Sequence, residues 1–189
     1  MPEIDDRFPL IKTKRLTLKA IEIEDAHAIY KMRSTKAVNR FIARVPMDDP
    51  ANAKELVNKT MEAFKNKMAI GWAGILRNGN NIIGTCGFNK IDHLNNSAEL
   101  GGELSSDFWG KGIAFEAVQA IVNYGIFELK LHRIEVYIDP ANRGAIAILE
   151  ALDFKKEAHF RDKILFQGTY MDMTVYSLLT KEYRGDKSS

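Results

Sequence analysis

The chain has 189 residues, with 46% hydrophobic and 28% charged residues, which is typical of a globular protein with one apolar core. Its formal net charge is +2 and its Lys and Arg residues are interspersed with Asp and Glu, which excludes the strongly basic footprint of a nucleic-acid-binding protein. A single cysteine, Cys86, excludes an intrachain disulfide, and the longest apolar run, residues 69–76, is too short to cross a membrane, so we expect a cytoplasmic protein without nucleic-acid or membrane partners.

The first half of the chain predicts a strand and two helices, followed by an antiparallel meander. The expected elements are a strand over residues 12–20, helices over 25–33 and from 50 onward, and strands over 69–77, 81–91 and 97–105. Asp49 and Pro50 supply an N-cap and a first-turn proline for the second helix. The expected buried face of that helix is Leu56, Val57, Met61 and Phe64. Asn78-Gly79, a strong short hairpin signal, is expected to join two of the strands.

The second half begins with a glycine-rich turn, residues 109–112, that opens a helix. The expected elements are helices over 113–129 and 142–152, a strand over 132–138, and two strands within 154–179 that turn at Gln167-Gly168-Thr169. The expected buried stripe of the first helix is Ala114, Ala117, Val118, Ile121 and Tyr124. A strand–helix–strand unit adds a parallel pair to an antiparallel sheet.

We therefore expect an α/β fold with a mixed, mostly antiparallel sheet and helices on both faces. The whole of residues 1–183 is expected to form one domain, and residues 184–189 a frayed tail.

The segment from residue 104 to 116 carries the chemical signal, because it joins a strand end, a glycine turn and a helix start. The first N–H groups of a helix have no internal partners and carry partial positive charge, and glycines let a phosphate approach the backbone. The segment is not a Walker A loop, since Lys111 is not followed by Ser or Thr, and Phe115 stands where a Rossmann fingerprint needs glycine. A glycine-eased helix start without a ligand remains the alternative.

An ordered series of motifs surrounds this turn. They are Thr-Lys-Arg-Leu-Thr-Leu at 13–18, Ala-Glu-Leu-Gly-Gly-Glu-Leu at 98–104, Trp-Gly-Lys-Gly-Ile-Ala-Phe-Glu-Ala at 109–117, Leu-His-Arg-Ile-Glu at 131–135, Asp-Pro-Ala-Asn at 139–142 and Leu-Glu-Ala-Leu-Asp-Phe at 149–154. Together they resemble the GCN5-related N-acetyltransferase (GNAT) superfamily, and within it the ribosomal-protein N-acetyltransferase (RimJ/RimL-like) branch. The resemblance covers about residues 13–179, nearly the whole chain.

The resemblance implies a GNAT fold and acetyl-CoA as cosubstrate. Backbone amides of the turn would bind the CoA pyrophosphate, and the pantetheine arm would lie where the strand at 99–104 splays from the strand at 132–138. The residues that the resemblance assigns to the cofactor are Leu104, Trp109, Gly110, Lys111, Gly112, Ile113, Ala114 and Asn142. Asn142 would contact pantetheine or orient the helix that follows.

Direct attack of an amine on a thioester needs a proton acceptor, donors for the oxyanion and stabilisation of the departing thiolate. Glu99 lies near the place where several superfamily members carry a carboxylate base, and Glu103 shares its strand face. Either glutamate could instead be solvated or salt-bridged. Ala145 replaces a serine that the branch often carries, and Leu149 replaces a tyrosine of other members, which leaves no obvious general acid.

Four further residues have mainly structural interpretations. Tyr124 and Tyr137 are nearby candidates for the missing acid but are expected in the core. Asp153 stands where the family usually has glycine, and Cys86 is expected as buried filler. The four histidines have no metal-ligand spacing, so no metal site is predicted.

The expected activity is transfer of acetyl to a primary amine. The acceptor could be the N-terminus of a ribosomal protein or another peptide, or a small amine such as a polyamine, an amino acid or an aminoglycoside. A CoA-binding module with little catalysis is the alternative from another class. A homodimer formed through the strands after Phe154 is also expected.

Overall fold

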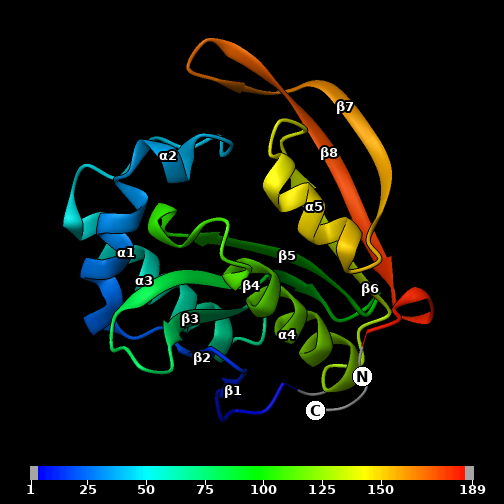
Figure 1. Cartoon of the computed structure of the whole chain (residues 1–189), viewed down its shortest axis with the longest axis horizontal. Coiled ribbons are helices and arrows are strands. Elements are labelled where there is room, and N and C mark those ends of the chain that lie inside the picture. Colours follow the sequence, from blue (N-terminus) through cyan, green and yellow to red (C-terminus); the bar gives the residue numbers. More distant parts are fainter. Residues whose placement is uncertain (1–3, 186–189) are drawn as a thin grey trace.

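The computed structural model describes residues 4–185 (Figure 1). Its strands are β1 (Ile11–Lys12), β2 (Leu16–Ala20), β3 (Ile70–Leu76), β4 (Ile82–Asp92), β5 (Ser97–Leu104), β6 (Arg133–Ile138), β7 (Lys155–Phe166) and β8 (Thr169–Leu179). Its α-helices are α1 (Ala26–Arg33), α2 (Lys36–Asn39), α3 (Pro50–Lys65), α4 (Ile113–Phe127) and α5 (Arg143–Ala151). Short 3-10 turns occupy Ile23–Asp25, Ser106–Phe108 and Thr180–Glu182.

All eight strands form one sheet in the order β1-β2-β3-β4-β5-β6-β8-β7. Neighbouring strands are antiparallel except β5 and β6, which are parallel and are joined by the crossover helix α4. The predicted mixed, mostly antiparallel sheet with one parallel pair is therefore confirmed.

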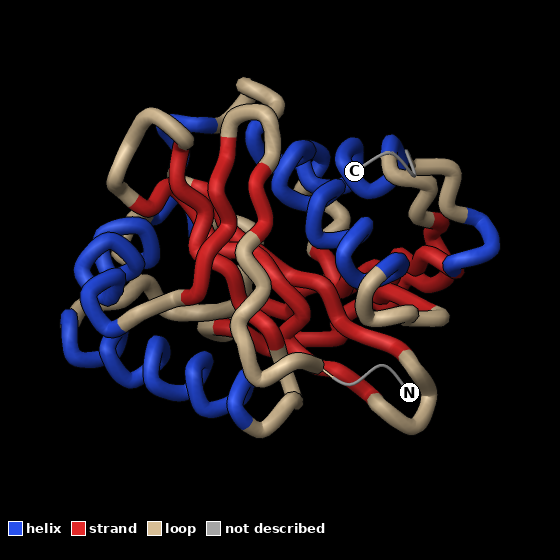
Figure 2. The backbone as a smooth tube through the Cα atoms, turned by 90° about the horizontal axis from the view of Figure 1, so that it is seen from below, coloured by secondary structure: helices blue, strands red, loops and turns tan. Residues whose placement is uncertain are grey.

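Helices cover both faces of the sheet, with α1 and α3 on one side and α4 and α5 on the other (Figure 2). Two consecutive residues of β3 point to opposite faces of the sheet, because side chains alternate along a strand. Ala73 packs with Ala53 and Val57 of α3. Trp72 packs edge-on against Tyr124 of α4, with ring centroids 5.3 Å apart.

Three details of the first half differ from the predicted elements. The strand expected at 12–20 is two strands, because the chain turns at Thr13, whose amide donates to the Leu16 carbonyl at 2.9 Å. The short helix α2 was not predicted, since four residues carry too little periodicity to be seen. In α3, Asp49 caps the helix as expected by accepting from the Ala51 amide, but Met61 is 46% exposed and Ala53 is buried instead.

The buried stripe of α4 was predicted only in part. Ile121 is fully buried, whereas the other four expected residues are half-buried. The other buried residues of the helix are Ile113, Val122, Gly125 and Ile126. Gly125 packs closely on the sheet, since a Cβ there would lie 2.6 Å from the Phe88 ring. The helix packs on the sheet and on α5, so its buried face is wider than a single stripe.

The two predicted hairpin turns take different forms. Gln167 and Gly168 both have positive φ, +48° and +79°, as a two-residue hairpin turn requires. Asn78-Gly79 instead lies in the longer connection between β3 and β4, where the Gly79 amide donates to the Leu76 carbonyl and φ is not positive. The strands pair across Ile75 and Ile82, so the turn is wider than Asn-Gly predicts.

The end of the described chain is held by the domain. The Arg184 amide donates to the Asp153 carboxylate at 3.0 Å, so the predicted frayed tail does not begin at residue 184. Residues 186–189 of that tail lie outside the described residues.

Candidate active site

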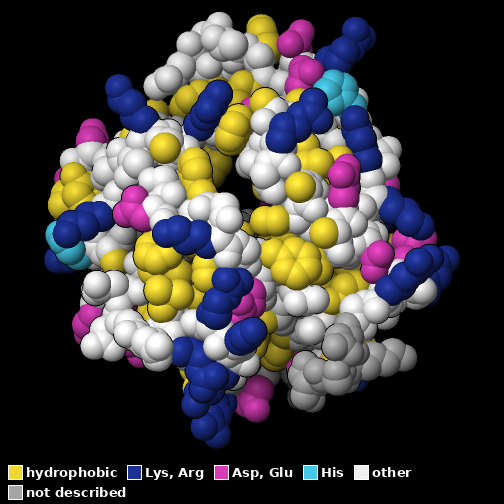
Figure 3. Space-filling view, viewed as in Figure 1, with side chains coloured by type: hydrophobic (Ala, Val, Ile, Leu, Met, Phe, Trp, Pro, Cys, Tyr) yellow, Lys and Arg dark blue, Asp and Glu magenta, His cyan; other side chains and the backbone are white. Residues whose placement is uncertain are grey.

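β5 and β6 pair for only three residues and then separate. Their register joins Ser97, Ala98 and Glu99 to Arg133, Ile134 and Glu135. Beyond these pairs, β5 continues along β4 to Leu104, while β6 continues along β8 to Ile138. The predicted splay is confirmed, and the space-filling view shows an opening through the middle of this face of the molecule (Figure 3).

The glycine turn between β5 and α4 has the geometry that a bound phosphate needs. Gly110 and Gly112 have φ values of +72° and +69°, and a Cβ at Gly110 would meet no atom within 4 Å. No backbone amide from residue 110 to 114 donates a hydrogen bond to any group of residues 4–185. A row of unpartnered N–H groups at a helix N-terminus is a seat for a pyrophosphate.

Two side chains of the turn make hydrogen bonds that hold its shape. The Trp109 indole donates to the Leu104 carbonyl at 2.8 Å, which ties the turn to the end of β5. The Lys111 ammonium donates to the Asp107 carbonyl at 2.7 Å and lies over the Phe108 ring. Ile113 is buried in the core and Ala114 is half-buried, so both offer only their amides.

Residues near the start of the chain form an ionic network that contacts the turn and supports it. Arg15 donates to the carbonyls of Lys111 and Gly112, at 2.7 and 2.9 Å, and pairs with Glu116 at 2.5 Å. Thr13 donates to the same carboxylate. Burial opposes ionisation of Glu116, but hydrogen bonds from Thr13 and Arg15 outweigh it and lower its pKa.

Arg15 and Glu116 were not among the predicted site residues. A signal for them existed, because both lie within quoted motifs, at 13–18 and 109–117. Only the fold brings the two motifs together, since 101 residues separate the paired side chains.

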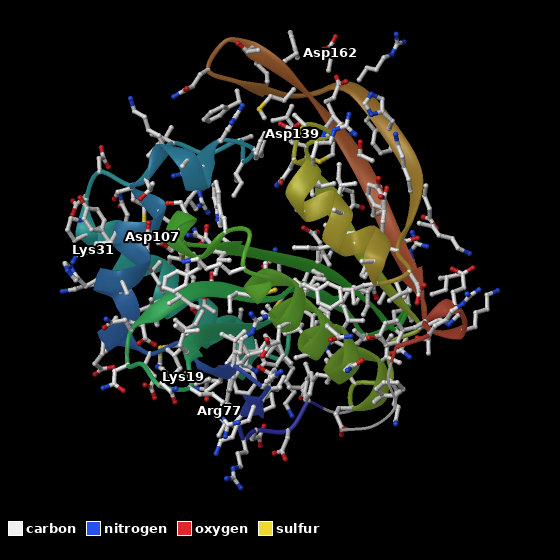
Figure 4. All side chains as sticks on the ribbon, in the orientation of Figure 1. Lys19, Lys31, Arg77, Asp107, Asp139 and Asp162 are labelled. Atoms are coloured by element: carbon white, nitrogen blue, oxygen red, sulfur yellow. The ribbon has the colours of Figure 1, made fainter. Side chains whose placement is uncertain are left out.

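The opposite side of the opening is formed by the start of α5. Asn142 caps this helix by accepting from the Ala145 amide at 3.3 Å. Figure 4 shows Asp107, in the turn after β5, and Asp139, in the turn before α5, on different sides of the gap between the two strands. The helix ends at Ala151, and Asp153, just beyond its C-cap Leu152, has a φ of +66°, the conformation for which glycine is favoured.

Glu99 lies on β5 at the last paired position before the strands separate, beside Glu135. Tyr137, two residues further along β6, is 48% exposed, and its hydroxyl donates to Glu135 at 3.3 Å. Partial burial and the negative charges of Glu135 and Glu99 raise the pKa of Tyr137, so it stays protonated at neutral pH. The prediction that Tyr137 is a core residue is wrong, because the Tyr137 side chain is exposed on the face of the sheet opposite α5. Tyr124 is packed in the core as predicted.

Glu103 has a different environment from Glu99 although both lie on one face of β5. Its side chain is 4% exposed, and its two carboxylate oxygens pair with Arg33 of α1, at 2.5 Å, and with Arg44. The Thr85 hydroxyl is 3.4 Å away. Of the two roles considered for Glu103, base or salt-bridged side chain, the geometry corresponds to the second, because accepting a proton would require breaking an ion pair.

A pocket of about 260 Å³ lies beside Glu103. Its walls are β3, β4 and β5 together with α1, α3 and the segment after α2, and they include Arg33, Arg44 and several aliphatic side chains. The pocket therefore lies on the α1/α3 face of the sheet, whereas the glycine turn opens α4 on the other face. None of the pocket residues outside β5 was predicted as a site residue.

Other chemistry is limited among the described residues. Burial raises the pKa of the Cys86 thiol to about 12, so it is not a ready nucleophile. The residue was expected to be buried filler, but it keeps some exposure and lines the pocket. Residues 4–185 contain no group of three His, Cys, Asp or Glu side chains that could hold a metal ion. No helix in this part of the chain is long and apolar enough to span a membrane.

Comparison with known proteins decides the family. The family model for the acetyltransferase (GNAT) domain matches residues 15–155. The chain belongs to the GNAT acetyltransferase family. It is 37% identical over 173 residues to the uncharacterized N-acetyltransferase p20 of Bacillus licheniformis, covering 92% of this chain and 97% of the relative. This confirms the expected class of enzyme, an acetyl-CoA-dependent acyltransferase.

More distant members of the GNAT family differ in their acceptors. The spermidine N(1)-acetyltransferase of Vibrio cholerae is 23% identical over 169 residues, covering 89% of this chain and 95% of that relative. The structure of RimL, a ribosomal L7/L12 α-N-protein acetyltransferase in complex with coenzyme A, superimposes with a TM-score of 0.83 at 19% identity, covering 90% and 98% of the two chains. The latter similarity shows the fold alone.

The GNAT geometry suits direct transfer between two reactants that approach from opposite faces of the sheet. A thioester placed where β5 and β6 separate would be reached from the α1/α3 face by an amine. Strand amides that lose their pairing at the split could donate to the oxyanion.

Proposed function

We propose that this protein transfers the acetyl group of acetyl-CoA to a primary amine within one domain of residues 1–183. The observation that carries the proposal is the row of unpartnered amides at residues 110–114 beside the point where β5 and β6 separate. The pyrophosphate would bind these amides, and Trp109, Lys111, Leu104 and Asn142 would hold the surrounding backbone.

Glu99 is the proposed proton acceptor in this reaction. It lies at the split of the strands and has no ion-pair partner among residues 4–185, whereas both oxygens of Glu103 are paired. Tyr137 is a proposed donor to the departing thiolate, because it is accessible on β6 next to the point where the strands separate, and its hydroxyl would exchange its hydrogen bond to Glu135 for one to the sulfur. Its presence supports catalysis over the alternative of a CoA-binding module.

The acceptor is either a peptide N-terminus or a small amine. The RimL-like fold favours the first and the relationship to spermidine acetyltransferases favours the second. Thiol release from acetyl-CoA, measured with a mixed library of peptides, amino acids, polyamines and aminoglycosides and followed by mass spectrometry, tests the proposal. Release above the rate without acceptor is expected, and none with any amine would contradict it.

The same proposal includes a homodimer formed through the hairpin of β7 and β8. This hairpin projects from the body of the molecule (Figure 1), and it exposes Phe160, Leu165 and Tyr170 beside the unpaired edge of β7. Exposed apolar residues on a sheet edge favour pairing with another chain. Light scattering at micromolar concentration should give twice 21.4 kDa, and a monomer would contradict it.

A further inference from the structure

The pocket beside Glu103 has an excess of positive charge. Two guanidinium groups, of Arg33 and Arg44, and one carboxylate are its only charged lining groups among the described residues. Burial is the main reason that the pKa of Arg44 is lowered, and the neighbouring Arg33 adds to it while Glu103 opposes it. Arginine side chains stay charged in proteins, so the two guanidinium groups and the carboxylate give the pocket one net positive charge.

The carboxylate of Glu103 does not use all the donors of the two arginines. Arg33 pairs through Nε alone, and its two terminal nitrogens have no acceptor within residues 4–185. Arg44 donates to Glu103 and Asn39 and leaves Nη1 without a partner there. The terminal nitrogens of Arg33 and Arg44 that lack a partner are not fully buried, and both arginines line the pocket.

The arginines are also held in place. Glu103, which is itself buried, fixes one edge of each guanidinium, and Asn39 fixes Arg44 while its own amide donates to the carbonyls of Arg33 and Thr35. A guanidinium whose remaining donors are preoriented binds a planar oxyanion with little further loss of side-chain entropy.

We infer that the acceptor carries a carboxylate in addition to the amine that is acetylated, and that Arg33 and Arg44 bind this carboxylate. The inference rests on the proposed function and names its substrate class. A polyamine is disfavoured, because its remaining ammonium groups would meet two guanidinium groups and only one carboxylate, which is already paired. The aliphatic walls, Ile21, Ile29, Ile42, Leu56 and Val57, accommodate the apolar part of the acceptor.

Two sources of such an acceptor share this chemistry, a free amino acid and a peptide with an acidic residue near its N-terminus. Matched pairs separate them: β-alanine against β-alaninamide, and Ala-Asp-Gly amide against Ala-Asn-Gly amide, with spermidine as the cationic comparison. The measured quantity is the ratio of kcat/KM for the carboxylate to that for its uncharged partner. Comparing this ratio between variants cancels the difference in amine basicity within a pair.

The kcat/KM ratio should rise with the net positive charge of the pocket in four proteins: the wild type, Arg44→Gln, Glu103→Gln and the double variant. Arg44→Gln should lower the ratio about tenfold and Glu103→Gln should raise it, as expected for one charge-assisted hydrogen bond lost or one competing carboxylate removed. The double variant should return it near the wild-type value. Arg44→Lys, which keeps the charge, controls for damage to the fold and should retain a ratio above that of Arg44→Gln.

A calorimetric titration of the CoA-saturated protein with the same pairs separates this inference from the proposed function. If no amine is acetylated but the carboxylate members bind more tightly in proportion to pocket charge, the proposed function fails and the assignment of Arg33 and Arg44 as a carboxylate-binding site stands. A preference in either pair supports the inference and identifies the source. Equal ratios in all four proteins, preference for spermidine, or no charge-dependent binding overturns it.

Discussion

The glycine turn at residues 109–112 and the pocket at Glu103 lie near the same end of β5, but they are built in different ways. The turn presents backbone amides from one continuous segment, and its side chains serve to hold its shape. The pocket presents side chains from α1, from the segment after α2 and from β5, and its Arg33 and Arg44 lie 70 and 59 residues along the chain from Glu103. Backbone donors suit a cosubstrate common to a family, whereas side chains can change with the acceptor without altering the fold.

The largest expected effect comes from placing a side chain in the glycine turn. Gly112→Asp should weaken CoA binding about a thousandfold, because it adds a negative charge and forces a non-glycine residue to a φ of +69°. Calorimetry with CoA measures the loss. Gly79→Asp, which adds the same charge in the connection between β3 and β4, should bind CoA normally. An unchanged affinity in Gly112→Asp would contradict binding of the pyrophosphate at this turn.

The two glutamates of β5 allow a sharper test on the acceptor side. Glu99→Gln should lower kcat about a hundredfold with little change in CoA affinity, as expected for loss of a general base. Glu103→Gln should affect kcat less and change KM for the acceptor more, since its carboxylate is held by Arg33 and Arg44. Steady-state kinetics decides, and near-native rates in both variants would point to a water molecule or to an amine that loses its proton in solution.

The support beneath the turn should matter less than the turn itself. Arg15→Met should weaken CoA binding about tenfold and lower stability by about 1 kcal/mol, a modest value because Arg15 is 42% exposed. Lys14→Met, on the same segment and also exposed, is the control. Calorimetry and denaturant unfolding measure the two effects, and equal behaviour of the two variants would contradict the role of Arg15.

The same network has a pH signature with a defined sign. Since the folded-state pKa of Glu116 is lowered from 4.5, its contribution to stability is present above that pH and is lost as the pH falls below it. The free energy of unfolding of Arg15→Met should therefore fall less than that of the wild type as the pH is lowered below 5. A parallel loss in both proteins would show that Arg15 does not stabilise the ionised carboxylate.

The smallest expected effect concerns α5. Ala145→Ser should raise kcat by up to about fivefold without tightening acetyl-CoA, because a single neutral donor to the developing thiolate contributes about 1 kcal/mol. Presteady-state kinetics identifies the reason for a null result. A burst of acetylated product would show that product release limits the rate. The absence of a burst would mean that another group, such as Tyr137, already donates to the thiolate.

Local sequence was sufficient for the elements whose signal is contained in neighbouring residues. The cap at Asp49, the turn at Gln167-Gly168 and the helix after Gly112 each depend on the conformation of a few consecutive residues. Asn78-Gly79 shows the limit of this reasoning, because the register of β3 and β4 set a longer connection than the dipeptide favours.

The sequence by itself determined the mixed sheet, the glycine turn and the family, since these follow from periodicity, glycine placement and an ordered series of motifs. Tertiary structure alone decided which charges meet: Arg15 with Glu116, and Arg33 and Arg44 with Glu103. It also decided that Glu99 and Glu103, on one face of one strand, have opposite environments. The physical reason is that backbone conformation is governed by near neighbours, whereas burial and charge pairing depend on segments that only the packed sheet and helices bring together.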